Sequence, residues 1–113
     1  MNLIDKTTFE ELRDTAGPDF VAELVDTFVE EAPAMLDQLR VARAAGDADV
    51  FRRAAHSLKS NSATFGALQL SALARRLELD GLAADPSRDN VAIDALEAAY
   101  QRAAAALQEL ARG

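Results

Sequence analysis

Hydrophobic residues recur every three or four positions along most of this chain of 113 residues. That spacing places apolar side chains on one face of a helix, whereas strands show strict alternation. The longest such run covers about 18–45 and carries Phe20, Leu24, Phe28, Met35, Leu36 and Leu39. Pro33 lies inside it and predicts a kink or a short interruption, because proline lacks an N–H and crowds the preceding turn.

A shorter helix is predicted before this long one. Residues 7–11 (TTFEE) contain the S/T-x-x-E pattern of a capping box, which predicts a helix over about 8–15. Gly17 then ends that helix, and Pro18 suits the first turn of the next one.

Two glycines set the following boundaries. Gly46 and Asp47 have the pattern of a C-cap followed by an N-cap, so a helix is predicted over about 48–65. Gly66 follows as the C-cap of that helix. Leucine spacing predicts a further helix over about 67–84.

Residues 85–90 form the one clear loop, and a last helix begins near Val91. Its apolar positions are Val91, Ile93, Leu96, Tyr100, Leu107 and Leu110. Four long helices with short connections predict an all-α fold, an antiparallel four-helix bundle with a short additional N-terminal helix over one end. The length suits a single domain over 1–113 and is too short for a kinase.

Composition excludes several kinds of chemistry. There is no cysteine, which removes disulfides, zinc–cysteine sites and thiol nucleophiles. No apolar run reaches the roughly 18 residues of a membrane span and no signal peptide opens the chain, so a soluble, cytoplasmic protein is expected. The net charge of −7 argues against nucleic acid and anionic membranes as partners.

The single histidine, His56, is the main candidate for chemistry. On a helical wheel Phe51, Ala54, Leu58 and Phe65 share one arc that predicts a core stripe, and His56 points roughly the opposite way. A histidine exposed on a helix is often inert, and composition alone favours that interpretation.

The neighbours of the histidine favour a functional interpretation. Arg52, Arg53 and Lys59 lie within about 60° of it on the wheel, and a cationic cluster there suits a phosphoryl group and an acidic partner. Ser60 and Ala63 are small and leave room for another protein to approach. Each feature also has a plain alternative: a solvated helix face for the charges, and tight helix packing for the small residues.

Other kinds of site lack supporting patterns. A Ser-His-Asp arrangement is formally possible, but no nucleophile elbow or oxyanion-hole loop is present. No metal site is predicted, since one histidine and scattered carboxylates have no ligand spacing. Glycine loops that cradle phosphates are absent as well.

Residues 55–67 (AHSLKSNSATFGA) strongly resemble the signature of histidine phosphotransfer (HPt) domains, in which H-x-L-K and a small residue precede an apolar residue and glycine. The periodic Leu70, Leu73 and Leu77, followed by Glu78, also fit that family. The resemblance covers about 18–84. One departure is Ser60, which stands where the family usually has glycine.

The resemblance implies a role for each matched residue. His56 would accept a phosphoryl group on Nε2, and Glu78 would accept a hydrogen bond from Nδ1–H, although a plain surface role for this glutamate is the alternative. Lys59 would neutralise phosphoryl oxygens, and Gly66 would permit a tight helix exit. Arg52, Arg53, Ser60, Ala63 and Arg75 would form the docking surface.

The implied function is a phosphorelay intermediate, a phosphocarrier rather than a kinase. Its partners would be receiver domains of a hybrid histidine kinase and of response regulators. No cofactor is expected on this chain, since Mg²⁺ would belong to the receiver, and a free-standing monomer would suffice for the chemistry. The main alternative is a helical adaptor that binds signalling partners without phosphorylation; a small helical enzyme or metal binder is the third.

Overall fold

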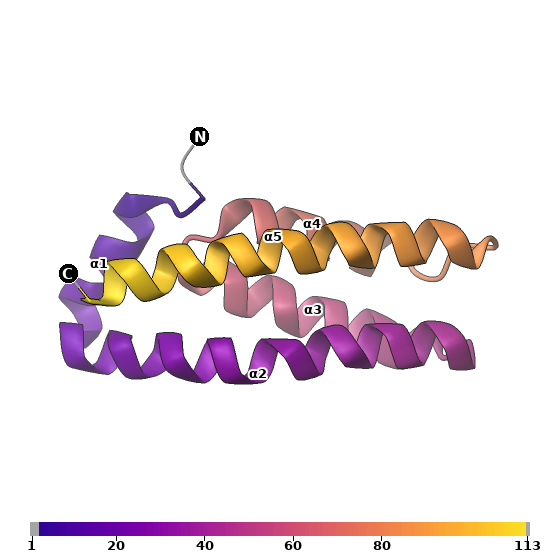
Figure 1. The fold of residues 1–113 in the computed structure, drawn as a ribbon, viewed down its shortest axis with the longest axis horizontal. Coiled ribbons are helices and arrows are strands. Elements are labelled where there is room, and N and C mark those ends of the chain that lie inside the picture. The colour runs from indigo at the N-terminus through magenta and orange to yellow at the C-terminus, as the bar shows by residue number, and fades with distance from the viewer. Residues whose placement is uncertain (1–2, 113) are drawn as a thin grey trace.

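The computed structural model describes residues 3–112, which fold into five helices and contain no strand. The helices are α1 (Lys6–Ala16), α2 (Pro18–Ala45), α3 (Ala48–Thr64), α4 (Leu68–Asp80) and α5 (Pro86–Arg112). In Figure 1, α2 and α5 run in opposite directions in front of α3 and α4, while α1 lies across one end. The antiparallel four-helix bundle with a short N-terminal helix is therefore confirmed.

The first helix begins earlier than its sequence pattern predicts. Asp5, not a threonine, is the N-cap, and its carboxylate accepts hydrogen bonds from the N–H of Thr8 at 3.3 Å and from the Thr8 hydroxyl at 2.5 Å. The predicted capping box is thus wrong, because the side chain of an aspartate two residues upstream caps the helix by accepting from the free N–H of Thr8. Phe9 is the buried residue that anchors this helix to the bundle.

The connection between α4 and α5 is also shifted. Helix α4 ends at Asp80, four residues before the predicted end, because Gly81 turns the chain away at φ 65°. Helix α5 begins at Pro86 rather than near Val91, since proline suits the first helical position. The loop between α4 and α5 therefore covers 81–85 instead of the predicted 85–90. Helix α4 ends two residues after Glu78.

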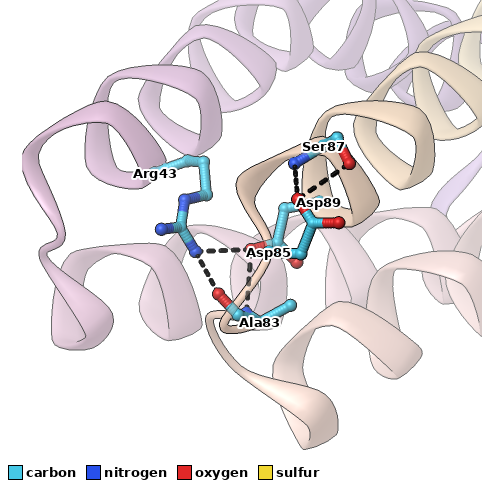
Figure 2. A network of polar contacts seen from close by, with 5 residues as sticks. All are labelled: Arg43, Ala83, Asp85, Ser87 and Asp89. Atoms are coloured by element: carbon cyan, nitrogen blue, oxygen red, sulfur yellow. Dashed lines mark hydrogen bonds and ion pairs between the residues drawn. The ribbon is translucent and has the colours of Figure 1, made fainter.

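A cluster of polar contacts holds this connection against α2 (Figure 2). Arg43 Nη1 donates to the Ala83 carbonyl at 2.8 Å and to Asp89 Oδ2 at 2.7 Å, while the N–H of Ala83 donates to the same carboxylate oxygen at 2.9 Å. Asp85 caps the start of α5 by accepting from the N–H and hydroxyl of Ser87. The loop is thereby fixed at both ends.

The bundle core consists of one continuous cluster of buried apolar side chains. Its largest fully buried hydrophobic members are Phe9, Phe51, Leu39, Leu58, Leu70, Ile93, Leu96, Leu107, Val21 and Val25. Helix α2 passes through Pro33 without a break, so the predicted interruption does not occur. Phe28 of α2 packs against Phe65 and Tyr100, with ring centroids 5.4 and 6.0 Å apart.

The turn between α3 and α4 places these two helices side by side. It is a Schellman motif in which the N–H of Gly66 donates to Ala63 and the N–H of Ala67 donates to Ser62, each at 3.0 Å. Gly66 has φ 81° and is buried, and its carbonyl accepts from the N–H of Asp5 at 2.8 Å. The turn therefore joins three helices, and the C-cap of α3 is Phe65 rather than the predicted Gly66, which follows it at a positive φ.

Candidate functional site

His56 projects from the outer face of α3, as the helical wheel predicts. The residues on the opposite side of this helix, Phe51, Ala54 and Leu58, are buried in the core. The histidine side chain is 61% exposed. No described residue hydrogen-bonds to its Nε2, so this nitrogen is open to a partner.

Glu78 of α4 reaches across to the other ring nitrogen. Its Oε2 lies 2.5 Å from His56 Nδ1, and the Glu78 side chain is only 15% exposed. The two helices are held in register nearby, where the Ser71 hydroxyl donates to the Lys59 carbonyl at 3.0 Å. The structure thus brings together the histidine and the glutamate that the resemblance paired.

Lys59 contacts the second oxygen of the same carboxylate. Its Nζ donates to Glu78 Oε1 at 2.8 Å, and its side chain is mostly buried. This hydrogen bond is the main reason that the pKa of Glu78 is lowered; the bond to His56 lowers it further, and burial acts against both. Lys59 therefore lies beside the glutamate on the α4 flank of the histidine.

The arrangement determines which nitrogen of a neutral His56 ring carries the proton. An ionised Glu78 offers only acceptors, so Nδ1 must donate and Nε2 keeps its lone pair. The exposed nitrogen is then the nucleophilic one. Chemically, the site presents an imidazole whose Nδ1 is hydrogen-bonded to a carboxylate and whose Nε2 is exposed.

The two arginines predicted for docking are exposed but not free. Arg52 and Arg53 both pair with Asp49, with N–O distances of 3.0 and 2.8 Å. The sequence analysis did not predict Asp49 as the partner of these arginines, although a spacing of three and four residues on a helix favours such ion pairs. Arg75 is exposed on α4 and makes no ion pair with a described residue.

Ser60 and Ala63 lie on the exposed surface of α3, beyond the histidine. The Ser60 carbonyl accepts from the Thr64 hydroxyl at 3.0 Å, and its own hydroxyl bonds to no described residue. Both side chains are small and exposed, and their part in the approach of a partner stays a prediction.

A hollow in the surface surrounds the histidine. Its lining residues come from α3 and α4 and are Arg52, Arg53, His56, Ser57, Glu78 and Leu79. Leu79 is 68% exposed, and sequence reasoning missed it because it considered only the periodic leucines of this helix, Leu70, Leu73 and Leu77. The hollow thus combines cations, an apolar side chain and the imidazole.

Two further findings limit the kinds of site in the part of the chain that the structure describes. Among residues 3–112, no three side chains of His, Asp or Glu gather closely enough to hold a metal ion. None of the helices in this range is long and apolar enough to cross a membrane.

Fold and site together define a class: a small helical bundle that exposes one histidine held by a carboxylate. Residues 23–111 match the sequence profile described as "Hpt domain". The chain belongs to this family, and it is a phosphotransfer domain of two-component signalling. Receiver domains are the class of partner that such domains have in phosphorelays.

Known proteins agree with this assignment. The chain is 31% identical to the sensor protein TorS of Escherichia coli (strain K12) over 97 residues, which is 84% of this chain and 11% of that protein. It therefore corresponds to about a tenth of the length of this relative. The crystal structure of histidine-containing phosphotransfer protein B (HptB) from Pseudomonas aeruginosa PAO1 is similar, with a TM-score of 0.71 and 28% identity over 97% of this chain and 91% of that one.

Proposed function

We propose that His56 accepts a phosphoryl group from the phosphorylated aspartate of one receiver domain and passes it to the aspartate of another. The observation that carries this proposal is the position of the ring, with Nδ1 held by Glu78 and Nε2 open to solvent. Phosphoryl transfer depends mainly on positioning and electrostatics, and a fixed, exposed imidazole supplies the positioning.

In the accepting step the Nε2 lone pair attacks phosphorus. The N–P bond forms as the P–O bond to the aspartate breaks, and the aspartate leaves as a carboxylate with the electron pair. The imidazole ring becomes positively charged in this step, because Nδ1 keeps its proton. Glu78 stabilises that charge at 2.5 Å, and the reverse step returns the phosphoryl group to a receiver.

Lys59 supplies positive charge at the edge of the transferred group. In the unphosphorylated site its ammonium group donates a hydrogen bond to Glu78. Once a phosphoryl group is on Nε2, the lysine shares its three N–H donors between the carboxylate and the phosphoryl oxygens. Mg²⁺ is assigned to the aspartate pocket of the receiver, so this chain needs no cofactor of its own.

The test is to mix the protein with phosphorylated receiver domains and Mg²⁺ and to follow the label. We expect the protein to acquire phosphate that is labile to acid and stable to base, as phosphoramidates on histidine are. Failure of wild-type protein to take label from any receiver of its genome contradicts the proposal.

A matched variant tests the site itself. His56→Gln keeps a polar side chain of similar size on the exposed face of α3 and removes the nucleophile. It is expected to fold normally by circular dichroism and to take up no label. Label on this variant would show that another residue carries the phosphoryl group.

A further inference from the structure

Asp49 holds two arginines in the first turns of α3, ahead of the histidine. Its Oδ1 lies 3.0 Å from Arg52 Nη2, and its Oδ2 lies 2.8 Å from Arg53 Nη2. One carboxylate therefore binds two guanidinium groups, and each of its oxygens has one partner. All three side chains are more than half exposed, so water competes with both ion pairs and each of them is weak.

Both arginines share the hollow in the surface with the imidazole of His56. Helix geometry explains this arrangement, because side chains lean toward the N-terminus of their helix and cover the preceding turn. For His56 that turn carries Arg53 and Arg52, three and four residues before it. A phosphoryl group on the ring therefore enters a hollow that already contains two guanidinium groups.

The two nitrogens of the ring face different neighbours. Nδ1 is hydrogen-bonded to Glu78 of α4, and Lys59, which donates to the same carboxylate, lies about 60° to that side of His56 on a helical wheel. Arg53 lies about 60° to the other side. Nε2 belongs to the edge of the ring away from Nδ1, so a phosphoryl group on Nε2 lies on the flank of Arg53.

The charges around His56 favour an anion on this flank. Three cations and two carboxylates are paired there, which leaves one excess positive charge while the ring is neutral. A phosphoryl group brings up to about two negative charges and three strong acceptor oxygens. A guanidinium group binds such oxygens through two parallel N–H donors. The phosphoryl group is therefore a stronger partner for Arg53 than a carboxylate that Arg53 shares with a second arginine.

We infer that phosphorylation of His56 moves Arg53 from Asp49 to the phosphoryl oxygens, and that Asp49 is a positioning residue that holds this arginine beside the unphosphorylated ring. Arg52 remains with Asp49 after the exchange. The inference rests on the proposed function, because it states what binds the phosphoryl group in that same site. Asp49 thereby competes with the phosphoryl group for Arg53 and limits how strongly the site retains it.

The first experiment measures the equilibrium of phosphoryl exchange between this protein and a receiver domain, with both dilute enough to remain mostly free. The ratio of phosphohistidine to phosphoaspartate then depends on the free proteins and not on how tightly they dock. Arg53→Gln is expected to shift the ratio about threefold toward the receiver, and Asp49→Asn about threefold toward His56, as for an exposed ion pair. Asp47→Asn is the matched control, because it removes a negative charge from the same end of α3, keeps a capping side chain and releases no arginine. It is expected to shift the ratio less than about 1.5-fold, since exposed charges at a distance are screened.

The double variant tests whether Asp49 acts through Arg53. In the Arg53→Gln background, Asp49→Asn is expected to shift the ratio less than about 1.5-fold, because no arginine is left to be released at that position. An undiminished shift in this background would mean that Asp49 acts through its own charge or through Arg52, and would overturn the inference. Equal ratios for wild type and Arg53→Gln would overturn it as well.

Phosphorus-31 NMR separates this inference from the proposed function. Potassium phosphoramidate labels the single histidine without a receiver, since Nε2 attacks phosphorus and ammonia leaves. A guanidinium group beside the phosphoryl group favours its doubly charged form, so Arg53→Gln is expected to raise the pKa of the phosphoryl group by about 0.5. Arg102→Gln, which removes an exposed cation on α5, is expected to leave that pKa unchanged.

The two proposals therefore fail in different ways. Wild-type protein that takes no label from any receiver contradicts the proposed function, and the titration of chemically labelled protein still tests the exchange of Arg53. Labelling of wild type by a receiver, with the same phosphoryl pKa in wild type and Arg53→Gln, contradicts only the inference about Arg53 and Asp49.

Discussion

The Tyr100 hydroxyl donates a hydrogen bond of 2.9 Å to the carbonyl of Val29, the one carbonyl in α2 that Pro33 leaves without its helical N–H donor. Burial raises the pKa of the Tyr100 phenol, so it remains a donor. Helix α5 thus supplies the hydrogen-bond donor that α2 lacks at Pro33. This replacement explains why α2 continues through the proline.

This relationship predicts a coupling between the two positions. Tyr100→Phe is expected to lower the free energy of unfolding by about 1 kcal/mol, because the carbonyl loses its partner. In a Pro33→Ala background the alanine N–H satisfies Val29, so the same change is expected to cost clearly less. Urea denaturation of the four proteins measures both costs, and equal costs in the two backgrounds would refute the coupling.

Gly46 and Gly66 both adopt a positive φ, which strains any other residue, but only at Gly66 would an added Cβ also collide with a neighbouring segment. The φ angles are 70° and 81°, respectively. A Cβ at Gly66 would lie 2.8 Å from the Asp5 carbonyl oxygen, whereas one at Gly46 meets nothing within 4 Å. Gly46→Ala is expected to cost about 1 kcal/mol of stability and Gly66→Ala about 2 kcal/mol or more, since the backbone of α1 must also move. Thermal or urea denaturation checks the order, and an equal cost at both sites would show that the contact with Asp5 is unimportant.

The buried pair of Arg43 and Asp89 predicts a large loss when one partner is removed. Their side chains are 15% and 6% exposed, and the Arg43 Nε is buried without a partner among the described residues. Asp89→Ala is expected to destabilise the protein by about 3 kcal/mol. The substitution leaves the buried Arg43 guanidinium without its ion-pair partner and removes the hydrogen bond to the N–H of Ala83. Asp94→Ala, which breaks an exposed pair with Arg40, is the control and is expected to cost under about 1 kcal/mol. Comparable losses in urea denaturation would mean that the buried pair contributes no more than a surface one.

The sequence analysis anticipated the bundle and the site because both depend on local periodicity and on a short signature. Helical spacing placed His56 on the side of its helix opposite the core. The resemblance paired His56 with Glu78 on the neighbouring helix, α4. The end of α4 and the start of α5 were mispredicted, although Gly81 and Pro86 mark them locally. Contacts across the fold also hold this connection in place, and the sequence pattern does not reveal them. The burial of Asp89 against Arg43 of α2, forty-six residues away in the sequence, is one such contact.

The electrostatics of the site were harder to anticipate. The wheel grouped Arg52, Arg53 and Lys59 as a cationic cluster beside the histidine, and in the structure each of them is paired with a carboxylate. Pairing with Asp49 follows from local spacing that was overlooked. Pairing of Lys59 with Glu78 follows from helix packing, which periodicity alone does not reveal.

Glu78 is predicted to set the rate of phosphoryl transfer without being needed for folding. Glu78→Ala removes the acceptor at Nδ1 and is expected to slow transfer to His56 about ten- to hundredfold, the size of effect seen when the hydrogen-bond partner of a metal-binding histidine is removed. Glu78→Gln keeps an acceptor oxygen but loses the charge, so its rate is expected to lie between those of Glu78→Ala and wild type. Rapid-quench transfer assays give the rates, and a wild-type rate for Glu78→Ala would show that this residue does not support the imidazole.

Lys59 is predicted to control the ionisation of Glu78. Because the hydrogen bond from Lys59 is the largest cause of the lowered pKa, Lys59→Met is expected to raise the pKa of Glu78 toward its ordinary value. A depressed carboxyl pKa stabilises the folded state above the ordinary pKa of about 4.3, and that contribution is lost as the pH falls through the lower, folded-state pKa. Wild-type stability should therefore fall more steeply than that of Lys59→Met in this acidic range.

Carbon-13 NMR titration of the Glu78 carboxyl measures the change in its pKa directly. Lys59→Arg, which keeps the positive charge, is expected to leave the pKa of Glu78 low. An unchanged Glu78 pKa in Lys59→Met would mean that His56, rather than Lys59, holds the carboxylate ionised.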